Sequence, residues 1–334
     1  MNNNNVNYLR IAVTDRCNLH CLYCSPLGTE AVDREDLLSF EDIHRLAKAA
    51  VHEGISRIRL TGGEPTTRRD ITRLVEMLSS IEGLKELAMT TNGLLLSSMA
   101  GELKEAGLTR VNISLDTLDA GKYKRMTGVD GLGRVLKGIE AARCSGLDPV
   151  KINVVAIQGF NDDEVHDFAM FASAESLTVR FIEMMPFHCN RGLQKDHFLS
   201  TATILELLKE KLPVEECNGG GQATGAIGGD QDGGPGPARY YRVVGEAGAI
   251  GLISPFSRPF CRSCNRLRIT SRGGLRNCLF SDSEIDVKTA VRAGASLEEL
   301  AAIIRSAISS KKNGHSLVHG QPGCRTFSIS QIGG

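Results

Sequence analysis

Three cysteines near the start of the chain have the types and spacing most suited to chemistry. Cys17, Cys21 and Cys24 form a Cys-x3-Cys-x2-Cys pattern within one short segment. Three thiolates from one loop can ligate three irons of a [4Fe–4S] cube and leave the fourth iron for a small molecule. An electron-transfer ferredoxin normally has a fourth cysteine in the same run, and zinc sites favour paired Cys-x2-Cys units. The spacing therefore predicts a reaction centre rather than an electron relay.

A second set of cysteines lies in the last third of the chain. Cys261 and Cys264 form a Cys-x2-Cys unit, and Cys278 follows without an obvious fourth partner. Cys324 could be that partner, which would make a closed structural zinc site. The spacing alone leaves a second open cluster and a zinc site as alternatives.

The run Thr61-Gly62-Gly63-Glu64-Pro65 is the third feature with chemical potential. Two glycines let the backbone approach a ligand closely, because no Cβ stands in the way. The carboxylate of Glu64 can accept a hydrogen bond from an ammonium group. On its own this run is an ordinary glycine turn, and its occurrence together with the cysteine triplet strengthens the prediction of a binding role.

Composition sets limits on fold and partners. The chain has 334 residues with 41% hydrophobic content, enough for one large or two ordinary domains. Its 39 basic and 39 acidic residues balance, so no global charge points to nucleic acid or to an anionic membrane. The sequence shows neither an export signal nor an apolar run of membrane-spanning length. Ten cysteines then indicate a reducing compartment, and we expect a cytoplasmic protein.

The elements that must position these motifs alternate between strand and helix. Strands are predicted at residues 8–14, 57–61, 86–91, 110–115, 150–157 and 177–183. Helices are predicted at residues 39–54, after an N-cap at Asp70, and at 97–106, 133–145 and 162–173. Such alternation predicts an α/β fold with parallel strands and right-handed crossovers.

The position of the motifs favours a barrel over a doubly wound sheet. The cysteine loop, the glycine turn, Thr90 to Gly93, and Ser114 with Asp116 all follow the ends of predicted strands, where barrel enzymes place their working residues. Residues 218–238 are dominated by glycine and are interpreted as a flexible surface loop. The expected domains are therefore 1–217 and 239–334, joined by that loop.

The motifs together resemble the radical S-adenosylmethionine (SAM) superfamily. The resemblance rests on the first cysteine triplet with Tyr23 and on the Thr61–Pro65 turn. More narrowly, Asn112 to Asp116, Cys261 to Arg268, Cys278 and the terminal Gly333-Gly334 resemble the MoaA-type GTP 3′,8-cyclase family of molybdenum-cofactor biosynthesis. This resemblance implies a partial (β/α)6 TIM-type barrel, with a C-terminal iron–sulfur module covering its open side.

The resemblance also implies a set of site residues and cofactors. Two [4Fe–4S] clusters are expected, one on Cys17, Cys21 and Cys24 and one on Cys261, Cys264 and Cys278. The expected SAM-binding residues are Tyr23, Gly63, Ser114 and Met185. The expected GTP-binding residues are Arg10, Arg59, Thr90, Lys151, Arg266, Leu267 and Arg268. The Gly333-Gly334 tail is expected to reach into the active site.

In such a lyase, a 5′-deoxyadenosyl radical from SAM removes the ribose 3′ hydrogen of GTP, and the C3′ radical attacks guanine C8. No side chain is needed as a catalytic acid or base. The implied partners are a low-potential one-electron donor, a cyclic pyranopterin monophosphate synthase that takes the product, and a second copy in a homodimer. The alternatives are another two-cluster radical SAM enzyme, such as a peptide modifier, and a zinc- or nucleic-acid-binding module.

Overall fold

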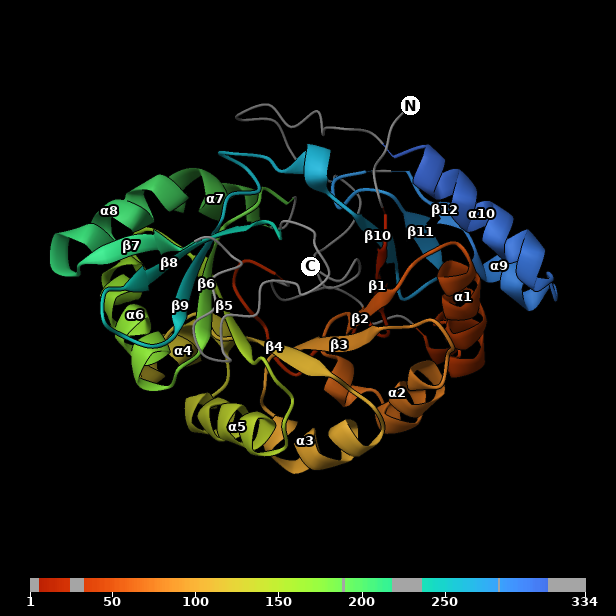
Figure 1. Cartoon of the computed structure of the whole chain (residues 1–334), viewed down its shortest axis with the longest axis horizontal. Helices are drawn as coiled ribbons and strands as arrows, with labels where there is room; N and C mark the ends of the chain where they lie inside the picture. Colours follow the sequence, from red (N-terminus) through yellow and green to blue (C-terminus); the bar gives the residue numbers. More distant parts are fainter. Residues whose placement is uncertain (1–5, 25–32, 188–189, 218–235, 282, 312–334) are drawn as a thin grey trace.

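A twelve-stranded sheet curves into an open barrel with helices on its outer side (Figure 1). The structure is a computed structural model that describes residues 6–24, 33–187, 190–217, 236–281 and 283–311. The strand order is β12-β11-β10-β1-β2-β3-β4-β5-β6-β9-β8-β7. The sheet does not close, which agrees with the predicted partial barrel.

The first six strands form the central part of this sheet in sequence order. They are β1 (Tyr8–Ala12), β2 (Arg57–Thr61), β3 (Glu86–Thr91), β4 (Arg110–Ser114), β5 (Lys151–Ala156) and β6 (Thr178–Glu183). Each strand pairs in parallel with the next, as the alternation of strands and helices predicts. All six predicted strands are confirmed, with small differences at their ends.

Strands from the later part of the chain extend both edges of the same sheet. They are β7 (Val214–Cys217), β8 (Ala238–Val243), β9 (Ala249–Ile253), β10 (Arg266–Ile269), β11 (Gly274–Arg276) and β12 (Ile285–Asp286). Strand β9 pairs in parallel with β6, and β10 pairs in parallel with β1. Since β9 and β10 lie at opposite sides of the opening, residues 254–265 between them must cross it (Figure 1).

Helices cover the outer face of the barrel. They are α1 (Phe40–His52), α2 (Ile71–Ser79), α3 (Leu96–Glu105), α4 (Ala120–Thr127), α5 (Leu132–Cys144), α6 (Val165–Ala174), α7 (Arg191–His197), α8 (Thr201–Lys211), α9 (Lys288–Arg292) and α10 (Leu297–Ser309). The predicted start of α1 is confirmed, because Ser39 and Asp42 form a reciprocal capping box. Among the described residues, no helix combines the length and apolar character needed to cross a membrane.

Asp70 occupies the predicted N-cap position of α2, but its side chain does not cap the helix. Asp70 has φ 59°, in the left-handed region, and its side chain makes no capping hydrogen bond. Capping side chains normally extend from a β-region backbone, which directs their oxygen towards the amides of the first turn. The exposed Asp70 carboxylate instead lies 3.6 Å from Nε of Arg69.

Candidate active site

Two adjoining cavities fill the interior of the open barrel. One, of about 190 Å³, is lined by the cysteine loop and by residues at the C-terminal ends of the strands. The other, of about 200 Å³, is lined by residues nearer the starts of the same strands and by the second cysteine set. Asn153, Ile182 and Met185 line both cavities, so the two spaces meet at these residues.

The glycine turn holds the cysteine loop against the end of β2. The backbone N–H of Gly63 donates to the Thr14 carbonyl, and that of Glu64 donates to the Arg16 carbonyl, both at 2.8 Å. A Cβ added at Gly62 would lie 2.2 Å from the Thr14 oxygen, and one at Gly63 would lie 2.2 Å from the Arg16 oxygen. The glycines are therefore required by contact between two backbone segments, and this contact sets the position of the loop.

Glu64 connects this turn to the end of β3. Its carboxylate is buried and accepts hydrogen bonds from Thr66 Oγ1 at 2.6 Å, Thr91 Oγ1 at 2.7 Å and Asn92 N at 2.6 Å. Burial raises the pKa of Glu64, and these hydrogen bonds partly offset that effect. Both carboxylate oxygens thus join the turn after β2 to the end of β3.

The four residues expected to bind SAM line the first cavity together with the first cysteine triad. They are Tyr23, Gly63, Ser114 and Met185. The Tyr23 hydroxyl donates to the Asp116 carboxylate at 2.8 Å, and Asp116 also accepts from the Val155 backbone at 2.8 Å. Burial raises the pKa of Asp116 to about 6. A buried polar network therefore orients the aromatic residue next to Cys24.

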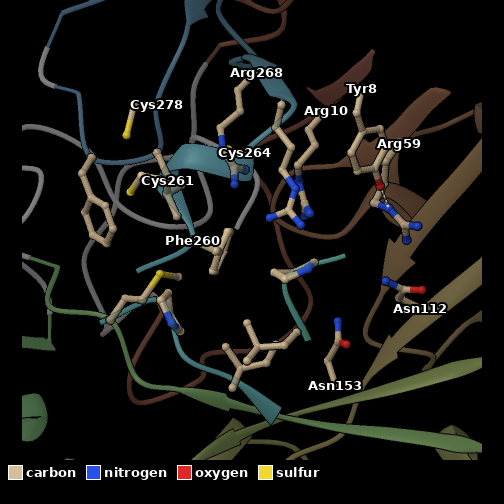
Figure 2. Close-up of a pocket in the computed structure, with 18 of the residues that line it drawn as sticks. Tyr8, Arg10, Arg59, Asn112, Asn153, Phe260, Cys261, Cys264, Arg268 and Cys278 are labelled. Carbon is tan, nitrogen blue, oxygen red and sulfur yellow. Dashed lines mark hydrogen bonds between the residues drawn. The ribbon is translucent and has the colours of Figure 1, made fainter. Parts of the chain in front are cut away.

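The second cavity is strongly basic. Figure 2 shows Arg268 near Cys264, Arg10 further along the cavity, and Arg59 with Tyr8 on the side away from Cys261 and Cys278. Its seven arginines are Arg10, Arg57, Arg59, Arg110, Arg180, Arg266 and Arg268. None of the described residues that line it is acidic. Such a surface suits a ligand with several negative charges, because guanidinium groups form paired hydrogen bonds with phosphate oxygens.

The register of the strands explains why these arginines meet. Arg10 on β1 lies level with Arg59 on β2 and with Arg268 on β10. Side chains two residues apart on a strand point to the same face. Tyr8 therefore forms a second row with Arg57 and Arg266. Three adjacent strands therefore present a continuous basic wall to the interior.

Holding the charged arginines of this cavity together costs free energy when no anion is bound, because they are buried. Burial, with the neighbouring Arg266 charge, lowers the pKa of Arg268 to about 10. Burial also lowers the pKa of Arg180 to about 10, and that of Arg10 falls well below its usual value for the same reason. A bound polyanion would relieve the cost of holding these charges together.

The two cysteine sets differ in their electrostatic surroundings. Burial raises the pKa of the Cys21 thiol well above its usual value, and the nearby Cys24 and Asp116 add to the effect. Burial also acts to raise the pKa of Cys264, but Lys311 and the neighbouring arginines outweigh it and lower the pKa overall. The second set therefore lies in a basic environment, and the first does not.

Some residues expected to bind GTP lie elsewhere. Thr90 lines the first cavity, and its Oγ1 accepts a long 3.4 Å hydrogen bond from Arg59. Lys151 is buried at the start of β5, level with Asn112. Leu267 is buried, between two arginines that line the second cavity. Gly333 and Gly334 lie outside the described residues, as does Cys324.

Sequence reasoning missed several residues that line the second cavity. They are Tyr8, Arg57, Arg110, Asn112, Asn153, Arg180 and Phe260. A signal was present, because β2 reads Arg-Ile-Arg and β4 begins Arg-Val-Asn, with polar residues at alternate positions of apolar strands. In a barrel that pattern indicates a polar interior.

The two triads fit clusters better than single metal ions. Among the described residues, no three His, Cys, Asp or Glu side chains converge as one metal ion requires. The thiols of each triad instead line the wall of a cavity. In an iron–sulfur cluster different irons receive the different thiolates, so a spread-out triad beside an open space fits such a group.

Comparison with known proteins agrees with this geometry. Residues 11–172 match the Radical SAM superfamily, and residues 177–317 match Molybdenum Cofactor Synthesis C. The GTP 3′,8-cyclase of Moorella thermoacetica is 46% identical over 330 residues, covering 98% of each chain. The chain belongs to the GTP 3′,8-cyclase family. Another member of this family, from Pelotomaculum thermopropionicum, is 44% identical over 334 residues, again covering 98% of each chain.

Solved structures support the fold of this family member. Streptococcus suis SuiB, in a crystal structure bound to S-adenosylmethionine, has a TM-score of 0.61 and 16% sequence identity. The similarity covers 90% of this chain and 68% of SuiB. At this identity the likeness shows the radical SAM fold alone.

Proposed function

We propose that the protein is a radical SAM GTP 3′,8-cyclase, a lyase that begins molybdenum-cofactor biosynthesis. It would convert GTP to (8S)-3′,8-cyclo-7,8-dihydroguanosine 5′-triphosphate. The observation that carries this proposal is the cavity lined by seven arginines, which adjoins the cavity of the first cysteine triad. The activity named for the relatives at 44% and 46% identity supports it.

The proposed cofactors are two [4Fe–4S] clusters and SAM. The first triad would hold one cluster, with SAM beside Tyr23, Gly63, Ser114 and Met185. Cys261, Cys264 and Cys278 would hold the other. When bound, the first cluster and SAM supply a 5′-deoxyadenosyl radical that can remove a hydrogen atom from the substrate. No described side chain is needed as an acid or base for that step.

The chain itself binds, orients and shields the substrate. The arginine wall would hold the triphosphate, and Thr90, Lys151, Leu267 and the Gly333-Gly334 tail are proposed as further GTP contacts. Asn153, Ile182 and Met185, where the two cavities meet, mark where the ribose would come closest to the SAM site. Buried walls exclude water from a reactive radical, and fixed orientation lowers the entropic part of the barrier.

The proposed setting follows from this chemistry. A low-potential donor would supply the electron, and a cyclic pyranopterin monophosphate synthase would take the product. We also propose a homodimer, and a cytoplasmic location whose reducing conditions protect the cysteines.

Anaerobic turnover with isotopically labelled substrate tests the proposal. The reconstituted protein would receive SAM, dithionite and GTP carrying deuterium at the ribose 3′ position. We expect 5′-deoxyadenosine that contains deuterium, together with the cyclised nucleotide. The Cys24→Ala variant should form neither product. Formation of 5′-deoxyadenosine without deuterium would show that the radical acts at another position and would overturn the proposal.

A further inference from the structure

Two arginines of β2 pack against the ring of Tyr8 on β1. The guanidinium carbon of Arg57 lies 5.7 Å from the centre of the ring, and that of Arg59 lies 5.9 Å from it. Nε of Arg59 also donates a hydrogen bond to the Tyr8 hydroxyl, drawn in Figure 2. One aromatic side chain thus contacts two cations that both line the second cavity.

These two arginines need such a contact because they are close, buried and of like charge. Arg57 is 4% exposed and Arg59 is 2% exposed, and they occupy alternate positions on one face of β2. Like charges repel strongly where water is scarce. The electron-rich face of an aromatic ring attracts cations, most strongly in desolvated surroundings. The Tyr8 ring therefore offsets part of that repulsion before any anion binds.

Further contacts fix the outer ends of both side chains. Arg57 donates to Asn7 Oδ1 at 3.0 Å, and Arg59 donates to the Met89 carbonyl at 3.2 Å. Both guanidinium groups are therefore held between Tyr8 and a second partner. Elsewhere in the cavity, Arg266 stacks in the same way over Phe260 at 5.5 Å.

We propose that Tyr8 is a positioning residue that holds Arg57 and Arg59 ready for the phosphate chain of the nucleotide. This inference rests on the proposed function, because it concerns the same cavity. A preorganised pair pays less ordering entropy when the ligand binds. The contribution of this arginine pair to binding affinity must depend on the number of phosphates in the ligand. Tyr8 would therefore favour binding of a triphosphate over binding of a nucleoside.

Binding measurements on the reconstituted holoenzyme test the inference without turnover. The Kd values of GTP, GDP and guanosine would be measured anaerobically by calorimetry for wild type, Tyr8→Leu and Tyr8→Phe. We expect Tyr8→Leu to weaken GTP binding about 10- to 100-fold, and guanosine binding less than about threefold. Tyr8→Phe keeps the ring and loses the hydroxyl, so it should weaken GTP binding about threefold.

The matched control is Tyr241→Leu. Tyr241 is a buried tyrosine on β8 that does not line the cavity, so its substitution tests for general loss of packing. Unchanged GTP affinity in Tyr8→Leu, or equal losses for GTP and guanosine, would overturn the positioning role. If Tyr8→Leu does not fold, Tyr8→Phe decides, and a GTP affinity equal to wild type refutes the inference. Failure of the proposed function gives a different result, in which the wild-type protein binds no GTP.

Discussion

Glu64 shows how one buried side chain can decide the geometry of a cofactor loop. Its two oxygens accept from Thr66, Thr91 and Asn92, while its backbone N–H holds the carbonyl of Arg16 next to Cys17. The residue therefore couples the end of β3 to the first cysteine loop.

Glu64→Gln should destabilise the fold measurably. The amide keeps one acceptor but turns the second oxygen into a donor that faces the N–H of Asn92. We expect a loss of about 1–3 kcal/mol in the free energy of unfolding, measured by urea denaturation of the metal-free protein. Glu82→Gln, at an exposed position, should change it by less than about 0.5 kcal/mol. A loss no larger than that of the control would contradict the role given to Glu64.

Substitution of Arg180 tests the part of the second cavity that the sequence motifs did not predict. The Arg180 guanidinium is oriented by Asn153 Oδ1 at 2.7 and 3.0 Å and lines the second cavity. Arg180→Met should weaken GTP binding about tenfold or more, because it removes a charged donor from a buried anion site. Arg143→Met, which breaks the surface ion pair with Glu175, should leave GTP binding unchanged. Equal GTP affinities for Arg180→Met and wild type would remove Arg180 from the proposed site.

The cysteines and four of the arginines that line the second cavity could be predicted because family motifs contain them. Arg57, Arg110 and Arg180 were not predicted, because an arginine at an alternate strand position fits a solvent-facing side as well as a polar barrel interior. Only the curvature of the sheet turns that face inward. The direction in which the sheet curves depends on all of the strands together, so the sequence of a single strand does not predict it.

At the scale of elements, local sequence predicted the first half of the molecule well. Strands β2 and β3 have the predicted bounds, since each is a short apolar run that ends in a turn. The position of β10 beside β1 was not predicted. That pairing joins residues about 250 positions apart, and neither strand carries a local signal of its partner.

Lys311, two residues after the end of α10, connects the two segments that carry the second cysteine set. Nζ of Lys311 donates to the Arg266 carbonyl at 2.8 Å and to the Asn277 carbonyl at 2.6 Å. Arg266 follows Cys264 by two positions, and Asn277 precedes Cys278. One buried ammonium group thus fixes the distance between two arms of the site.

Lys311→Met should weaken iron binding at the second cluster site that we propose. The test uses a background in which Cys17, Cys21 and Cys24 are alanine, so that only the second set can hold iron. Iron loss to a chelator, followed by absorbance, should become about tenfold faster. The control is Lys104→Met, which removes a hydrogen bond from Nζ to the Gly146 carbonyl at 2.6 Å. Neither residue lines the second cavity, so this variant should lose iron at the unaltered rate. Equal rates for both variants would show that Lys311 does not support the site.

At the scale of the whole molecule, the opening of the barrel is crossed by residues 254–265. This segment is anchored at the end of β6 by Glu183, which is fully buried. The Glu183 carboxylate accepts from Phe256 N at 3.2 Å, Ser257 N at 2.9 Å and Thr201 N at 3.0 Å. One carboxylate therefore holds the crossing segment and the start of α8 together.

Glu183→Gln should make the crossing segment open more often. Phe256 N and Ser257 N donate to Oε2 of Glu183, and Thr201 N donates to Oε1. The amide keeps only one acceptor oxygen, so it cannot satisfy both sides and part of the anchor is lost. Hydrogen exchange at Phe256 and Ser257 should become about tenfold faster or more, while exchange in β3 stays unchanged. Glu215→Gln, which breaks an exposed ion pair with Arg242 on the edge hairpin, serves as the control. Unchanged protection at Phe256 and Ser257 would refute this view of the anchor.

The distribution along the chain of the seven arginines that line the second cavity has a consequence for synthesis of the protein. Five of them precede β6 or lie within it, whereas Arg266 and Arg268 belong to β10. A chain emerging from the ribosome presents the first cysteine loop long before those last two cations exist. The arginine lining of the second cavity is complete only after β10 has been translated. Products terminated before residue 261 would thus lack the second cysteine set and two of the seven arginines, although they would contain the first cysteine triad.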